Sequence, residues 1–321
     1  MKENTQLNID GIITNEQSVA IDIYEKEKPL SVHWELRTIL YIGILLFTTG
    51  ISILVYKNID TIGHQVILTI IAALCIGCFY YGYKHRLPYS QEETKQPSPF
   101  FDYIVLLGCL LFGIFIGYLQ VQYSLFGLHY GIAIFFPTII FFFCGYIFDH
   151  KGILNLGITG LAAWAGLTVT PLDLLKKNDF SDTTIIYTSI ILGLLILGFS
   201  KYCDNKNIKK HFGFSYNTFA ANILFIATLA ALFDQPFKWL SILFLTGICY
   251  YYIKYAIAQH SFLFLLLSVV YGYIGLSYCV FKILVSLNGD IAVTIVSFYI
   301  AASCGGVVAF FINYKKILQI K

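Results

Sequence analysis

The sequence predicts an all-α protein that lies in a membrane as a polytopic bundle of about ten transmembrane helices. Ten apolar runs, each long enough or nearly long enough to cross a bilayer, alternate with short polar connections. Hydrophobic residues make up 58% of the chain and charged residues 12%, and the mean hydropathy is +0.73. This composition leaves too little polar surface to cover a soluble globule of this size. We therefore expect most of the chain to face lipid.

An apolar helix needs about 20 residues to cross the hydrocarbon core. The predicted spans cover residues 38–56, 62–81, 101–120, 129–148, 152–170, 184–200, 218–233, 239–258, 261–285 and 291–313. The run over 218–233 is barely long enough. Residues 1–37 are mostly polar and are predicted to form a short cytoplasmic N-terminal helical segment, which argues against a cleavable signal peptide. Residues 38–321 form the predicted bundle.

The basic residues predict which side of the membrane each connection faces. With alternating spans, sixteen of the 21 Lys and Arg residues fall on one side, and the other side holds Lys57, Lys176, Lys177, Lys238 and Lys282. Cytoplasmic connections carry the excess of Lys and Arg. We therefore expect both termini in the cytoplasm and an even number of spans. The net charge of +3 is explained by basic residues beside anionic headgroups and implies no nucleic-acid partner.

The N-terminal segment contains a helix start signal. Thr14-Asn15-Glu16-Gln17 matches a capping box, in which the Thr14 hydroxyl accepts a bond from the Gln17 amide and the Gln17 side chain returns one. The short helix that follows has an amphipathic surface, made by Ala20, Ile23 and Tyr24 with Ile13 and Gln17. That surface could lie on the membrane or bind a partner protein.

A family resemblance rests on about the first 85 residues. They contain Gly11-Ile12-Ile13-Thr14-Asn15-Glu16-Gln17, then Trp34-Glu35-Leu36-Arg37, Gly43 and Gly50 in the first span, and Tyr56-Lys57-Asn58-Ile59-Asp60 at its end. This order resembles the predicted bacterial membrane proteins of domain-of-unknown-function family 2157. The chain departs from the family pattern at Ile59, where a tryptophan often follows the asparagine. The resemblance implies many spans behind a small N-terminal helix, and it implies no reaction, ligand or catalytic residue.

Polar or helix-interrupting residues within spans are the first candidates for substrate contacts. Asn155 and Trp164 share the fifth span with Gly157 and Gly160, and small residues of this kind allow close helix contact. We expect this span to be central in the bundle. Candidate substrate-binding residues are Pro137, Asn155, Trp164 and Asn222. Ordinary helix packing is the alternative explanation for all four.

A second polar group is predicted on the side away from the cytoplasm. Lys57, Asn58, Asp60 and His64 fall between the first two spans, where a tight turn is expected. A histidine beside a carboxylate can sense pH or bind a cation, but the same residues are usual in any solvated turn. Asp149-His150-Lys151 makes a similar turn on the cytoplasmic side.

The eight cysteines do not predict a metal or redox site. Seven lie within apolar spans, where Cys packs as a small hydrophobic residue, and Cys203 is placed in a loop. Cys75 and Cys78 have no second pair or nearby histidine to complete a zinc site. The phosphate-loop, zincin and serine-hydrolase motifs are absent from the sequence. We expect no cofactor and no metal, and enzymatic activity is not favoured.

Two function classes remain for a multi-pass protein of the bacterial inner membrane. Ten spans with both ends inside can divide into two inverted halves of five, as in many carriers. Tyrosines clustered at 250–252, 271 and 273 suit an apolar or lipid-like substrate. This favours transport of a small apolar or amphipathic solute. The alternative is a non-transporting envelope scaffold or sensor whose N-terminal helix binds a partner protein.

Overall fold

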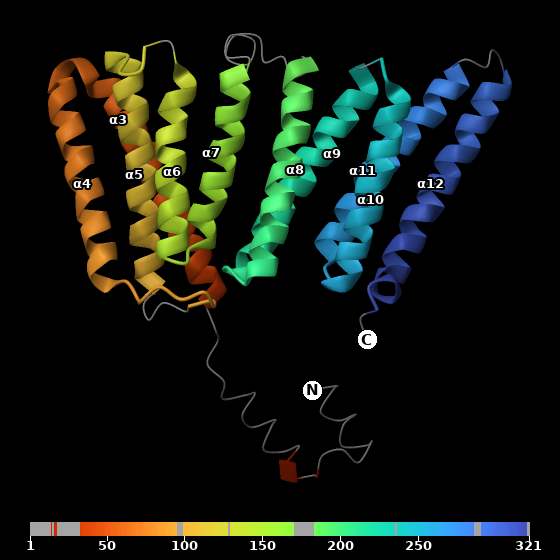
Figure 1. The fold of residues 1–321 in the computed structure, drawn as a ribbon, viewed down its shortest axis with the longest axis horizontal. Coiled ribbons are helices and arrows are strands. Elements are labelled where there is room, and N and C mark those ends of the chain that lie inside the picture. The colour runs from red at the N-terminus through yellow and green to blue at the C-terminus, as the bar shows by residue number, and fades with distance from the viewer. Residues whose placement is uncertain are drawn as a thin grey trace. The chain divides into compact units, whose positions relative to one another are not determined.

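The computed structural model describes residues 14, 16–17, 33–94, 99–127, 129–169, 183–234, 236–285 and 290–319. Within these residues the chain forms ten long α-helices and one short 3-10 helix (Figure 1). They are α3 (His33–Ile62), α4 (His64–His85), α5 (Pro99–Tyr123), α6 (Tyr130–Ile147), α7 (Lys151–Val169), α8 (Thr183–Lys206), η2 (Lys210–Phe212), α9 (Gly213–Asp234), α10 (Lys238–Ala258), α11 (Phe262–Val285) and α12 (Asp290–Ile317).

The chain divides into two compact units, Met1–Leu54 and Val55–Lys321, so the boundary falls inside α3. In the second unit each helix from α4 to α12 packs against the next one along the chain. Figure 1 shows neighbouring helices of this unit running in alternating directions. Alternation of this kind is what short connections between spanning helices require.

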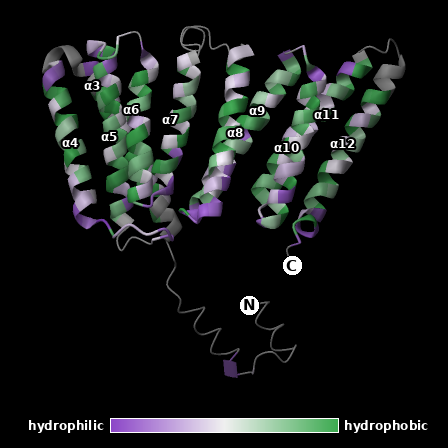
Figure 2. Cartoon of the chain, viewed as in Figure 1, coloured by the Kyte–Doolittle hydropathy of each residue, from purple (hydrophilic) through white to green (hydrophobic). Residues whose placement is uncertain are grey.

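The helices carry the apolar surface that a bilayer demands. Eight of them are long and apolar enough to cross a membrane, namely α4, α5, α6, α8, α9, α10, α11 and α12. Hydrophilic residues of the second unit gather at the helix ends and connections, and the lengths between them are hydrophobic (Figure 2). The predicted helical membrane bundle is therefore confirmed. The apolar stretch of α3, Thr38–Leu54, is shorter, and α7 is less apolar, so spanning by these two stays a prediction.

The structure corrects the turn that the sequence places after the first span. Lys57, Asn58 and Asp60 lie inside helix α3, and only Gly63 separates α3 from α4. Gly63 has a φ of +82°, which residues with a side chain rarely adopt. A helix satisfies its own backbone hydrogen bonds, so it need not end where the apolar run ends. The 30 residues of α3 extend about 45 Å, which exceeds the hydrocarbon core.

The most buried span is α9, rather than the fifth span that the sequence favours. In α9, 61% of the span is buried, compared with 22–33% in α4, α5, α6, α8, α10 and α11. It also begins at Gly213, five residues before the predicted start at Thr218. Ser215, Tyr216 and Asn217 are buried within the bundle, and this polar first part makes the span look shorter in the sequence. Helix α9 contributes side chains to two apolar clusters, one with α10 and α11 and one with α7 and α8.

Small residues bring α6 and α7 close together, as predicted for the fifth span. A Cβ atom on Gly145 would lie 3.1 Å from the backbone nitrogen of Leu154, and one on Gly157 would lie 3.3 Å from the Phe142 ring. A Cβ on Gly160 would overlap the Thr138 hydroxyl. These glycines therefore allow the two helices to pack at short distance.

The connections after α4, α6 and α8 meet on one side of the second unit. The backbone nitrogen of Thr94 donates to Asp149, and Lys209 forms an ion pair with the same carboxylate. His260 donates from Nδ1 to the Leu318 carbonyl, which joins the α10–α11 turn to the end of α12. The sequence places all these connections on the side of the membrane that carries most of the Lys and Arg residues. Their meeting on one side agrees with the predicted alternation of the spans.

Two further predictions concern single residues. The capping box is confirmed, because the Gln17 nitrogen lies 3.3 Å from the Thr14 hydroxyl and the Thr14 nitrogen lies 2.9 Å from Gln17 Oε1. The amphipathic helix expected after it lies outside the described residues. Cys203 is a buried residue of α8 rather than a loop residue, and all eight cysteines are free thiols.

Replacing Gly160 with leucine should destabilise the α6–α7 pair. The added side chain overlaps Thr138, and overpacking of this kind costs about 1–3 kcal/mol. We expect a lower Tm for Gly160→Leu in detergent. Gly117→Leu is the matched control, because a Cβ on Gly117 meets no other atom within 4 Å. Equal Tm values for the two variants would contradict the close contact.

Candidate functional site

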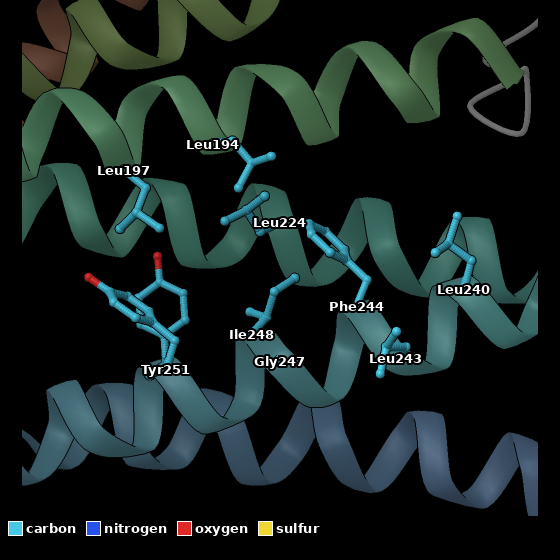
Figure 3. Close-up of a pocket in the computed structure, with 10 residues that line it drawn as sticks. Leu194, Leu197, Leu224, Leu240, Leu243, Phe244, Gly247, Ile248 and Tyr251 are labelled. Carbon is cyan, nitrogen blue, oxygen red and sulfur yellow. The ribbon is translucent and has the colours of Figure 1, made fainter.

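A groove opens between α8 and α10 (Figure 3). Both helices pack on α9, and Leu224 of α9 lies between the side chains that α8 and α10 contribute. The groove has a volume of ≈ 290 Å³ and is lined by Leu194, Leu197, Leu224, Leu240, Leu243, Phe244, Gly247, Ile248, Tyr251 and Tyr252. Leu240 and Leu243 are 64% and 71% exposed. The groove is therefore open on the outer surface of the bundle, within the apolar part of the helices.

Helical periodicity explains the lining of the groove. On α10 the lining residues recur at intervals of three and four, from Leu240 to Tyr252, and so share one face of the helix. Gly247 lies in the middle of this face, and a Cβ atom there would meet nothing within 4 Å. The absence of a side chain at Gly247 thus keeps part of the groove open.

One end of the groove is polar. Tyr252 is fully buried, and its hydroxyl donates to the Asn217 carbonyl of α9 over 3.4 Å. The Lys201 ammonium lies 4.5 Å from the centre of the Tyr251 ring. A cation over a tyrosine face contributes about 0.5–1 kcal/mol at an exposed site. The groove therefore ends at Tyr251, with a positive charge over its ring.

A polar pocket follows at the same end of α8 and α10. Its volume is ≈ 730 Å³, and it is lined by Asp204, Asn205, Lys210, His211, Gly213, Phe214, Tyr255, Gln259, His260 and Ser261. The ring of Tyr255 stacks on that of Tyr251 with 6.3 Å between the ring centres. Because Tyr251 lines the groove and Tyr255 lines the pocket, these stacked rings separate the two cavities by about one helical turn.

Beside the pocket, the Asp149 carboxylate is the centre of a buried ionic cluster. Its Oδ1 lies 3.0 Å from Lys209 Nζ and also bonds His211 Nε2, and its Oδ2 accepts bonds from the Thr94 nitrogen and hydroxyl at 2.7 and 3.0 Å. The Asp149 and Lys209 side chains are 2% and 1% exposed. Lys209 also lies over the ring of Tyr89, 5.2 Å from its centre.

The environment of Asp149 favours its charged form. Burial raises the pKa of this carboxyl, but the hydrogen bonds from Thr94, Lys209 and His211 outweigh burial and hold the pKa below the usual Asp value. Lys209 adopts a φ of +45°, a left-handed conformation that costs roughly 1–2 kcal/mol for a residue with a side chain. The ion pair therefore holds the α8–α9 connection in a conformation that it would not adopt alone.

An exposed ion pair lies next to this cluster. Lys151 donates to Glu93 over 2.8 Å, and the two side chains are 49% and 54% exposed. The hydrogen bond from Lys151 lowers the pKa of Glu93. Such exposed pairs contribute about 0–1 kcal/mol, because solvent screens them.

On the opposite side of the second unit, His64 bonds residues of α5. Its Nδ1 lies 2.7 Å from the Tyr118 hydroxyl, and its Nε2 lies 3.0 Å from Gln122 Nε2. Both ring nitrogens are thus engaged by neutral side chains. Of the residues predicted beside it, Lys57 is exposed. The role predicted for this polar group stays a prediction.

The four candidate substrate residues lie on three helices and have different surroundings. Pro137 is buried in α6, and the Trp164 ring of α7 packs on Phe135 with 4.9 Å between ring centres. Asn155 is half-buried, and its Oδ1 has no hydrogen-bond partner among the described residues. None of the four lines the groove or the polar pocket. Their role in substrate binding stays a prediction.

Asn222 shows that a polar residue within a span can bond between helices, as the sequence analysis expects of such amides. The Tyr271 hydroxyl of α11 donates to its Oδ1 over 3.2 Å. One sequence feature indicates the groove, namely the tyrosines at 250–252, of which Tyr251 and Tyr252 line it. The sequence places Asp149 in a polar cytoplasmic turn, but it does not indicate the partners of Asp149 or Lys201, because these are distant in the sequence.

The described part of the chain contains no group of three or more His, Cys, Asp or Glu side chains that could hold a metal ion. The residues around the groove and the pocket supply hydroxyls, amides, imidazoles and ammonium groups, together with one carboxylate, that of Asp204. Groups of this kind bind anionic and hydrogen-bonding ligands.

Comparison with known proteins gives one match. Residues 5–154 match the family model described as predicted membrane protein (DUF2157). The match extends past the first 85 residues on which the resemblance rests and reaches the first turn of α7. No curated protein and no solved structure matches the chain. The chain is therefore similar, over its N-terminal part, to membrane proteins whose family description states no function.

Replacing Asp149 with asparagine should strongly destabilise the protein. The change leaves the Lys209 ammonium buried without its anion, and breaking a buried pair costs about 3–5 kcal/mol. We expect a large loss of Tm in detergent at neutral pH. A lowered carboxyl pKa stabilises the fold above the unfolded pKa, and this stabilisation is lost as the pH falls through the folded pKa. The difference between wild type and Asp149→Asn should therefore shrink below about pH 4.

Glu93→Gln is the control for this prediction, because it removes a carboxylate from the exposed pair with Lys151. We expect it to change the stability by about 0–1 kcal/mol. If the two variants lowered Tm equally, the buried cluster would have no special importance for the fold.

Proposed function

We propose that this chain is a multi-pass protein of the bacterial cytoplasmic membrane that transports a small apolar or amphipathic solute through the groove between α8 and α10. The observation that carries the proposal is the position of the groove mouth. Leu240 and Leu243 are largely exposed on a helix that is apolar enough to span a membrane. A solute dissolved in the bilayer can enter there without passing through water.

The polar end of the groove supports an amphipathic solute over a wholly apolar one. Lipid chains are as apolar as leucine, so the leucine lining alone gives little preference for a solute over a lipid chain. Tyr251 adds a hydroxyl and Lys201 adds a charge at one end. A solute with one polar end would be held by these groups, and its apolar part would lie along α10.

We also propose that both termini lie in the cytoplasm. The connections that meet around Asp149 and the α10–α11 turn that bonds Leu318 belong to the side with most of the basic residues. Cytoplasmic connections carry such an excess. The polar pocket would then open toward the cytoplasm, beside the inner leaflet.

The orientation predicts the behaviour of reporters fused after Lys321. Alkaline phosphatase folds only outside the cytoplasm, so its fusion should be inactive, whereas a fluorescent protein at the same position should glow. Fusions at residue 177, on the opposite side in the predicted topology, should give the reverse pattern. An active phosphatase after Lys321 would reject the orientation.

The transport proposal is tested with the full chain in lipid vesicles that contain a lipid with a nitrobenzoxadiazole label. Dithionite bleaches only the labelled lipid of the outer leaflet, so transfer between leaflets raises the bleached fraction. We expect a higher bleached fraction with wild type than in protein-free vesicles. Gly247→Trp should abolish the difference by filling the groove. Gly77→Trp is the matched control, because Gly77 has open space and lies on α4.

The alternative is a non-transporting scaffold or sensor in the envelope. The observation in its favour is the confirmed capping box of Thr14 and Gln17, a signal for a helix start ahead of the first span. A helix of this kind could bind a partner protein. The vesicle experiment separates the two functions, since a scaffold would leave the bleached fraction at the protein-free value.

A further inference from the structure

We propose that the polar pocket is the headgroup site for an anionic phospholipid whose acyl chain lies in the apolar groove. This inference rests on the function proposed for the groove, and it names the class of ligand. Its basis is the juxtaposition of two cavities of opposite character along the same pair of helices. The apolar cavity lies within the spans, and the polar cavity lies where α8 and α10 end.

The two cavities follow one face of α8. Leu194 and Leu197 line the groove, and Asp204 and Asn205 line the pocket. Lys201 falls between these pairs, and residues three and four apart share a helix face. On α10 the same order is found, with Tyr251 in the groove and Tyr255 in the pocket. A single molecule with an apolar tail and a polar head fits this sequence of surfaces.

The charges along this path favour an anionic head. Lys210 lines the pocket together with Asp204, whose carboxyl group it attracts, and Lys201 lies at the junction with the groove. Asp204 is the one carboxylate among the lining residues. Two lysines thus face one acid, and each basic residue near the surface adds about 1 kcal/mol to the binding of an anionic lipid.

The cavity sizes agree with a lipid that is only partly enclosed. The polar pocket measures ≈ 730 Å³, which lies within the range of sites for small ligands. The apolar groove measures ≈ 290 Å³, so it can hold part of one chain and leaves the remainder in the bilayer. The Tyr251 hydroxyl at the junction can donate to an ester carbonyl, which is the group between head and chains.

The test compares two photoreactive lipids in vesicles of phosphatidylcholine that contain the full chain. One lipid is phosphatidylglycerol and the other is phosphatidylcholine, and both carry a diazirine at the same acyl position. After irradiation, mass spectrometry locates the labelled residues. We expect the groove segments of α8 and α10 to be labelled about 25-fold more by the anionic lipid, which corresponds to about 2 kcal/mol from the two lysines together. Equal labelling by the two lipids would overturn the proposal.

Three lysine variants test which positive charges cause the preferential labelling by phosphatidylglycerol. Lys201→Gln and Lys210→Gln should each reduce labelling by phosphatidylglycerol about fivefold. Lys254→Gln is the matched control, because Lys254 is an exposed residue of α10 that lies over Tyr250 and lines neither cavity. If Lys201→Gln and Lys210→Gln left the labelling unchanged, the headgroup site would be rejected.

A competition experiment adds glycerol phosphate at high concentration. If it removed the labelling, the occupant of the pocket would be a soluble phosphate ester, and the lipid site would be overturned. The labelling experiment and the transport experiment can fail independently of each other. Anionic labelling without transfer between leaflets would reject the transporter and keep the lipid site. Transfer that does not distinguish the two lipids would keep the transporter and reject the anionic headgroup site.

Discussion

The buried ion pair between Asp149 and Lys209 is the interaction on which the second unit depends. Each charge is almost completely removed from solvent, so each would be strongly destabilising without the other. The carboxylate also accepts two bonds from Thr94 and one from His211. Three connections that are far apart in the sequence are thereby joined at one point. The ion pair also holds Lys209 in its left-handed conformation, directly before the η2 turn that leads into α9.

The position of α9 then determines the arrangement of the helices around it. Its first half is tied to four neighbours by hydrogen bonds, which link Tyr216 to Tyr146 of α6, Asn217 to Ser200 of α8, the Asn217 carbonyl to Tyr252 of α10, and Asn222 to Tyr271 of α11. Bonds of this kind contribute about 0.6–2 kcal/mol each within a membrane. Because α8 and α10 both pack on α9, the space that remains between them becomes the groove. His211 belongs both to the Asp149 cluster and to the polar pocket, so the ion pair also positions one wall of the proposed headgroup site.

The sequence predicts the parts of this structure that depend on local patterns. Apolar runs predict the ten helices, the spacing of Thr14 and Gln17 predicts their capping box, and glycines in the fifth span predict its close contact with α6. The errors arise where partners are distant. The start of α9 is missed because Asn217 is polar, although its side-chain nitrogen donates to the Ser200 hydroxyl and the Gly213 carbonyl inside the bundle. Nothing near Asp149 in the sequence indicates Lys209, so neither the buried cluster nor the pocket beside it could be predicted.

The distribution of polar groups also limits what the groove can select. In water, an apolar cavity binds apolar ligands because binding removes the apolar surfaces of both the cavity and the ligand from contact with water. In a bilayer that driving force is absent, since a ligand leaves one apolar environment for another. The leucines of α8 and α10 can therefore exclude a molecule by shape but give little affinity. Affinity must come from groups that a lipid chain cannot satisfy, and along this groove these are Lys201 and the Tyr251 hydroxyl at one end. The selectivity of this site is therefore determined at the end where α8 and α10 reach the membrane surface. The groups there distinguish ligands by their polar heads rather than by their apolar chains.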